Sequence, residues 1–149
     1  MPRISNAIIG AGGVFHAASV LSMRGLIALP TIKNTAGYDI IVTSPDGLKH
    51  ANIQVKTSSS RPGYWPICSG VANVKTSPND FYVLLRRTKD NVSFEGFMLT
   101  GEEMKSELER YMAYYAAKGQ RSDNFSLCAS LGDEEKNQRW RDMWNRWTL

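Results

Sequence analysis

The sequence lacks most features that would place it outside ordinary compact proteins. Only two of its 149 residues are cysteines, Cys68 and Cys128. They match no zinc-site spacing or disulfide framework, so we expect both to be reduced. No apolar run approaches the roughly 20 residues that cross a bilayer, and the N-terminal segment lacks the pattern of a signal peptide. We therefore expect one compact domain, residues 1–149, in the cytoplasm and without a membrane contact.

Acidic residues are also scarce in one half of the chain. Residues 1–38 contain no Asp or Glu. Residues 1–78 carry seven Lys or Arg against two Asp, a net charge of +5, whereas residues 79–149 carry 11 basic and 12 acidic residues, a net charge of −1. A basic half favours a polyanionic partner such as nucleic acid, because Lys and Arg neutralise phosphates and release counterions. Many solvated surfaces are equally basic, so the charge alone does not decide.

The hydrophobic pattern predicts an α+β (mixed α/β) domain with a central mixed β-sheet flanked by helices. A Pro-Gly turn at 44–47 joins two of the strands in a hairpin, and Thr100 with Glu103 forms a capping box. The segment 57–79 reads as largely irregular. The expected strands are 26–29, 38–43, 50–57, 64–67, 81–86, 93–99 and 125–128, and the expected helices are about 12–24, 100–117 and 133–147.

Three polar residues are expected to meet at one end of this sheet. Gln54 and Lys56 project from the same face of one strand, because side chains alternate along a strand. The hairpin brings Asp39 beside them. A carboxylate there can hold Mg²⁺ or Mn²⁺, with the Gln54 amide or the Val55 carbonyl as further ligands, and the metal can activate water. Lys56 can stabilise the negative charge that develops on a phosphate.

These residues resemble the core of the PD-(D/E)xK nuclease superfamily, which has the restriction endonuclease-like fold. The similar segments are Gly37–Val42 and Gln54–Ser58, and they match a small bacterial branch of uncharacterised proteins with a D…QxK motif. Further similar segments are Gly13–Gly25, Asn79–Val83 and the Trp-containing tail from Trp140 to Trp147. The resemblance implies metal-dependent hydrolysis of DNA phosphodiester bonds by an endodeoxyribonuclease, with Asp39, Gln54 and Lys56 as catalytic residues and Asp39, Gln54 and the Val55 carbonyl at the metal.

One position departs from the pattern of the family. Active members usually carry a Glu directly after the Gly that corresponds to Gly13, and this chain has Val14 there. His16 and Ser19 lie on the same expected helix, but neither supplies the missing negative charge. The departure implies a weak or inactive nuclease. The alternative is a non-catalytic module that keeps the fold and binds nucleic acid or another protein.

Other residues are candidates for contacts with partners. We predict that Lys33, Arg61 and Lys75 contact the nucleic-acid backbone and that Trp65 stacks on a base, although packing of Trp65 in the core is an equal alternative. Trp140, Trp144 and Trp147 recur at helical spacing, which indicates one face that closes the core. An interface, including one in a homodimer, is the other interpretation of this stripe.

Overall fold

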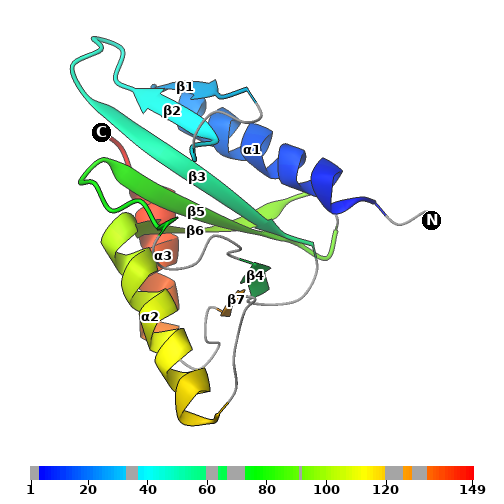
Figure 1. The fold of residues 1–149 in the computed structure, drawn as a ribbon. Coiled ribbons are helices and arrows are strands. Elements are labelled where there is room, and N and C mark those ends of the chain that lie inside the picture. Colours follow the sequence, from blue (N-terminus) through cyan, green and yellow to red (C-terminus); the bar gives the residue numbers. More distant parts are fainter. Residues whose placement is uncertain are drawn as a thin grey trace.

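A computed structural model describes residues 4–32, 37–59, 64–66, 73–90, 92–119, 126–128 and 134–149. It confirms the mixed α+β class (Figure 1). The helices are α1 (Asn6–Met23), α2 (Gly101–Ala117) and α3 (Glu134–Arg146). The strands are β1 (Ile27–Pro30), β2 (Ile40–Thr43), β3 (His50–Ser58), β4 (Tyr64–Pro66), β5 (Asp80–Arg87), β6 (Phe94–Thr100) and β7 (Ser126–Cys128).

Five strands form a mixed sheet in the order β1-β2-β3-β5-β6, and β4 pairs with β7 in a separate two-stranded sheet. The hairpin of β2 and β3 is antiparallel, as expected, with Ile40 opposite Ile53. β3 and β5 run parallel, with Gln54 opposite Tyr82. β5 and β6 return to antiparallel pairing. The parallel pair therefore lies in the middle of the sheet, beside the expected site on β3.

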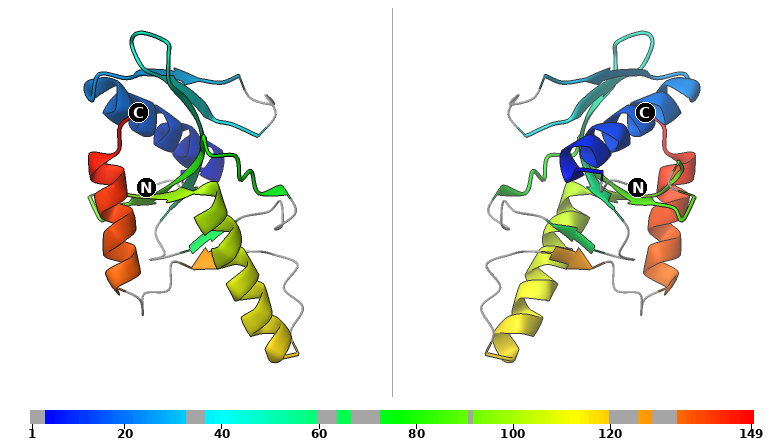
Figure 2. Two further views of the ribbon diagram at one scale, coloured as in Figure 1. Left: turned by 90° about the vertical axis from the view of Figure 1, so that its left-hand side faces the viewer. Right: turned by 90° about the vertical axis from the view of Figure 1, so that its right-hand side faces the viewer.

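α1 covers one face of the sheet, α2 covers the other, and α3 lies against the edge strand β6 (Figures 1 and 2). α1 packs on the face that carries Ile53 and Val55, in the cluster that includes Leu21. α2 packs on the opposite face through Met104 and Leu108. α3 contacts β6, the edge strand of the sheet. Trp140 packs with the α2 cluster and Trp144 with the α1 cluster, so α3 contributes to the core on both sides of that edge.

α1 begins earlier than the glycine-rich sequence indicated. The helix starts at Asn6, where the Ser5 hydroxyl accepts a hydrogen bond from the Ile8 amide as the N-cap. The helix continues through Gly13. A Cβ at this position would lie 2.0 Å from the Thr57 hydroxyl of β3, so only glycine fits there. The glycine therefore allows the close approach of α1 to β3. The chain leaves the helix through Gly25, whose φ of 84° is left-handed.

α1 also corrects one expectation about apolar segments. Its 18 residues have a mean hydropathy of 1.3 and 28% of them are buried in the fold. By length and composition alone the helix would pass as a membrane span. The core helix of a soluble protein and a signal sequence pass the same test, so length and composition alone do not assign α1 to a membrane. In the fold, α1 packs on the sheet through the buried residues Ile9, Gly13, Ala17, Ala18 and Leu21.

The capping box of α2 is confirmed. The Thr100 hydroxyl accepts from the Glu103 amide at 3.2 Å, and a Glu103 carboxylate oxygen accepts from the Thr100 amide at 2.9 Å. The expected end of α2 is also confirmed, since Gly119 follows it with a φ of 68°. The expected N-terminal residue of the last helix, Asp133, lies outside the described residues.

Candidate functional site

A cavity of about 650 Å³ lies beside β3, at the point where β2 has not yet begun to pair. Its walls come from the first half of α1, from the chain after β1 and from the residues that lead into β2. Most of the lining is apolar. The lining residues are Ala7, Gly10, Ala11, Val14, Phe15, Pro30, Thr31, Ile32, Gly37, Tyr38, Asp39, Gln54 and Val55.

Asp39 is fixed at this cavity by two hydrogen bonds with β3. Its amide donates to the Ile53 carbonyl at 2.9 Å, and its Oδ2 accepts from the Val55 amide at 2.7 Å. The carboxylate therefore takes the place of the next backbone acceptor of β2. The Val55 amide and carbonyl point to the same side of the strand, so the Val55 carbonyl oxygen is also directed past the start of β2. One carboxylate and one carbonyl thus lie at the same gap in the sheet.

No cation neutralises Asp39 within the described residues. The carboxylate is half-buried and its one described side-chain hydrogen bond is the one from the Val55 amide. The ion pairs of the described chain involve Glu95, Glu103 and Glu107 instead. A partly buried carboxylate normally has a compensating charge or several hydrogen bonds. Among the described residues, Asp39 therefore lacks the compensating charge that a bound cation could supply.

Gln54 and Lys56 lie on the same face of β3, as the alternation predicts. This face carries Tyr82 and Leu84 on β5, which are opposite Gln54 and Lys56 in the register. Gln54 lines the cavity with Asp39 and Val55, whereas Lys56 does not. The three expected metal ligands thus all border this cavity, but the Gln54 side chain projects from the sheet face opposite α1. The expected catalytic lysine, Lys56, lies two residues further along β3.

Val14 lies in the cavity wall, on the α1 side. At this position the resemblance to the nuclease motif implies a Glu. His16 is turned toward β6, where its ring packs on Phe94 at 5.0 Å, and partial burial lowers the pKa of its imidazole. Ser19 is exposed and does not line the cavity. The described residues contain no group of three or more His, Cys, Asp or Glu that could hold a metal.

The available donors still fit a hard divalent cation. The Asp39 oxygen that does not bind Val55, the Val55 carbonyl and the Gln54 amide are all oxygen ligands. Mg²⁺ is commonly held by one or two carboxylates while water and substrate phosphates complete its coordination. With one anionic ligand the affinity of the protein alone should be low, because ligand charge strongly affects affinity.

A polar network beside the site was not expected from the sequence. Asp80 is 3% exposed and accepts hydrogen bonds from Asn52 Nδ2 and from the Ser77 amide, each at 3.0 Å. Burial, a hydrogen bond to Asp80 and the charge of Asp80 raise the pKa of Tyr38. Tyr38, the residue before Asp39, is therefore influenced by the charge of Asp80. The signal in the sequence is the Ser77–Asp80 turn, whose carboxylate can bind the local backbone.

Lys75 lies close to the same edge of the cavity. Its amide donates to the Tyr82 hydroxyl at 3.0 Å, and its Cε would lie 3.4 Å from a Cβ at Gly37. Burial is the largest influence that raises the pKa of Tyr82. The Lys75 residue is exposed. It is therefore the predicted phosphate contact that the described structure places nearest the cavity lining.

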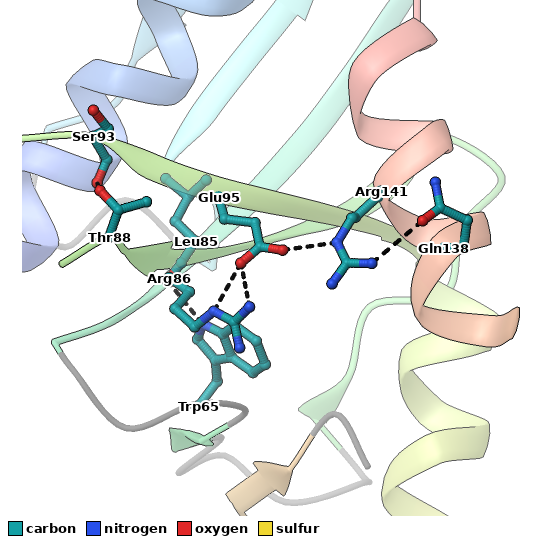
Figure 3. Close-up of polar contacts among 8 residues, drawn as sticks. All are labelled: Trp65, Leu85, Arg86, Thr88, Ser93, Glu95, Gln138 and Arg141. Carbon is teal, nitrogen blue, oxygen red and sulfur yellow. Dashed lines mark hydrogen bonds and ion pairs between the residues drawn. The ribbon is translucent and has the colours of Figure 1, made fainter. Parts of the chain in front are cut away.

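The other predicted nucleic-acid contacts have different outcomes. Lys33 and Arg61 lie outside the described residues. Trp65 is fully buried and its Nε1 donates to the Leu85 carbonyl at 2.9 Å (Figure 3). The indole also packs edge-on against Phe97, with ring centroids 5.7 Å apart. The prediction that Trp65 stacks on a base is wrong for this structure, because the apolar ring closes the core below β5.

Comparisons with known proteins add no assignment. No family model matches the chain, and no curated protein is similar to it at a significant level.

Proposed function

We propose that this protein is a cytoplasmic, metal-dependent DNA endonuclease of the PD-(D/E)xK type, with a restriction endonuclease-like fold and low intrinsic activity. The observation that carries the proposal is the carboxylate of Asp39, which has no ion pair among the described residues and is held by the Val55 amide at a cavity that Gln54 also lines. A fixed carboxylate without a cationic partner is the simplest protein element of a Mg²⁺ site.

In this proposal Asp39, Gln54 and the Val55 carbonyl hold Mg²⁺ or Mn²⁺. The bound ion would acidify a water molecule and polarise the phosphodiester group. The Val55 amide keeps the Asp39 carboxylate oriented. Lys56 on β3 and Lys75, whose amide contacts Tyr82, would supply positive charge to a bound phosphate. Val14 leaves the site with one anionic ligand, which is the reason we expect low activity.

A second candidate function is a non-catalytic module that binds nucleic acid. It is favoured by the apolar side chain of Val14 in the cavity wall and by the absence of any acid from residues 1–38. In this case DNA binding would not require a metal and would weaken with salt, because counterion release would supply most of its free energy. A protein without DNA affinity would instead act as an interaction module.

Cleavage of supercoiled plasmid and of branched DNA, each with Mg²⁺ or Mn²⁺, tests the proposed nuclease. Asp39→Asn and Lys56→Met should each lower the rate at least tenfold. Asp142→Asn and Lys89→Met are matched controls, because they remove the same charges on α3 and in the β5–β6 turn. Cleavage that both site variants leave unchanged would reject this site. Metal-independent, salt-sensitive DNA binding without cleavage would favour the second candidate.

A further inference from the structure

The outer side of α1 is apolar and exposed. Ile4, Ile8, Phe15 and Met23 are 46, 65, 66 and 86% exposed. At 100° per residue Ile8, Phe15 and Met23 fall within about 80° of one another, on the side of the helix opposite the buried residues Ile9, Gly13, Ala17, Ala18 and Leu21. Ile4 lies in the chain just before the helix. No other described element covers this face (Figure 2). We call Ile4, Ile8, Phe15 and Met23 the outer apolar face.

The size of this face is close to what a specific interface uses. At roughly 200 Å² for each large apolar residue, the four side chains leave about 500 Å² of apolar surface uncovered. Between them lie exposed small residues, Ala7, Ala11, Gly12, Ser19 and Ser22. These extend the face toward the roughly 800 Å² that each partner contributes to a standard interface, and they allow a second helix to approach closely.

The charge of the face limits what can bind it. Residues 4–23 contain no Asp, Glu, Lys or Arg, and burial lowers the pKa of His16, the one histidine on the helix. A charged partner would therefore lose hydration without gaining an ion pair. A second copy of the same uncharged face has no charged groups, so it would lose no charge hydration on binding. The face also has no basic residues that would attract an anionic membrane surface.

The spacing along the helix is suited to two-fold self-association. Ile8 lies seven residues before Phe15 and Met23 lies eight residues after it, which is about 11 Å and about 12 Å along the axis at the α-helical rise. In an antiparallel pair centred near Phe15, Ile8 of each copy would therefore lie opposite Met23 of the other. A two-fold interface requires this self-complementarity.

We propose that α1 is the interface of a homodimer, in which the outer apolar faces of two copies pack antiparallel about Phe15. The proposal rests on this surface and not on the proposed nuclease activity. Phe15, Ala7 and Ala11 also line the cavity at Asp39, so the interface would border that cavity. Because one helix from each copy supplies the contact, we expect a dissociation constant in the micromolar range.

Sedimentation velocity from low to high micromolar concentration tests the dimer. The wild type should change from monomer to dimer over this range. Ile8→Glu and Met23→Lys should each weaken association at least tenfold, because each buries a charge without a partner. The double variant should regain dimerisation, since the antiparallel arrangement pairs the new opposite charges between copies. Leu48→Glu and Val92→Lys, at exposed apolar positions away from α1, should match the wild type.

Three results would overturn the proposal. The first is a wild type that stays monomeric over the whole concentration range. The second is single variants that associate as strongly as the wild type. Circular dichroism identifies any variant that fails to fold, and Phe15→Ala then provides a milder test of the same contact. Monomeric wild type that sediments with vesicles of phosphatidylcholine and phosphatidylglycerol would assign the face to a membrane surface instead.

Discussion

Asp39 and Glu95 are both partly buried carboxylates, but their surroundings differ. Glu95 on β6 accepts from Arg86 and from Arg141, at 2.9 and 2.7 Å for the two Nε atoms, and Arg141 also contacts Gln138 (Figure 3). Asp39 has one described side-chain hydrogen bond, from a backbone amide, and no ion pair in the described chain. The comparison indicates different roles. The negative charge of Glu95 stabilises the contact between sheet and α3, whereas in the proposed function the charge of Asp39 binds a cation.

The two sides of the sheet also differ in how many ion pairs they form among the described residues. Glu103 pairs with Arg139 at 2.7 Å, and Glu107 pairs with Lys136 at 2.9 Å, so charges join α2 to α3. The α1 side of the sheet has no comparable ion pair among the described residues. It is held by apolar packing and by the close contact of Gly13 with Thr57. In the part of the chain that the structure describes, Asp39 accordingly forms no ion pair.

The largest expected effect is on stability, at the paired carboxylate. Glu95→Ala should lower the free energy of unfolding by about 1 to 2 kcal/mol, because it removes the carboxylate that accepts from both Arg86 and Arg141. The value stays modest since the three side chains are 21 to 29% exposed. Urea denaturation measures it, with Glu109→Ala on the exposed side of α2 as the control. Equal stability of both variants would contradict a structural role for Glu95.

The second prediction changes the unpaired site. Val14→Glu adds a carboxylate to the cavity wall and should raise Mn²⁺ affinity about tenfold, or about 1.4 kcal/mol. Isothermal titration calorimetry measures the affinity. Ser19→Glu adds the same charge to an exposed position of α1 that does not line the cavity, so it should leave the affinity close to wild type. An equal gain in both variants would show only a general charge effect.

The third prediction is a pH dependence that belongs to Glu95. Partial burial opposes its ionisation, but the hydrogen bonds and charges of Arg86 and Arg141 outweigh burial and lower its pKa. Its contribution is therefore fully present above the ordinary Glu pKa and is lost as the pH falls through the lowered value. Urea midpoints measured between pH 6 and pH 3, as a rough working range, should fall less steeply for Glu95→Gln than for wild type. Parallel curves would contradict the assignment.

The smallest stability effect is expected at Asp39. Asp39→Asn keeps an oxygen that can accept from the Val55 amide, and the wild-type carboxylate has no ion pair to lose in the described chain. The free energy of unfolding should change by less than about 0.5 kcal/mol. Thermal or urea denaturation provides the value. A loss as large as that of Glu95→Ala would mean that the Asp39 charge is structural.

Local sequence signals predicted much of this fold. The turn residues at 44–47 predicted the β2–β3 hairpin, and Thr100 with Glu103 predicted the start of α2, because each signal acts within a few residues. The start of α1 was predicted too late, near residue 12, because Gly10, Gly12 and Gly13 suggested that the early turns are interrupted. Only the contact between Gly13 and Thr57 explains why a helix carries glycine there.

Long-range packing was harder to predict from the sequence. Three tryptophans at helical spacing predicted core packing correctly for Trp140 and Trp144, which are 1 and 4% exposed. Their division between two clusters depends on the position of α3 at the edge strand β6, which no local pattern encodes. Trp65 likewise packs through the pairing of β4 with β7, across more than 60 residues of sequence.

The candidate site was predictable in its residues and less so in its surroundings. Alternation on β3 and the hairpin register placed Gln54 and Asp39 together. The gap in pairing beyond Ile40, which frees the Val55 amide for Asp39, depends on where β2 begins. The Tyr38–Asp80 interaction depends on the parallel pairing of β3 with β5, since this pairing brings Asp80 beside Asn52.

Binding of Mn²⁺ to the whole protein, followed by electron paramagnetic resonance without DNA, tests the role of Asp39 most directly. The wild type should bind the ion weakly, Asp39→Asn should lower the affinity at least tenfold, and Asp142→Asn should match the wild type. Equal Mn²⁺ binding by wild type and Asp39→Asn, or no binding by the wild type in the millimolar range, would contradict the assignment of Asp39 as a cation ligand.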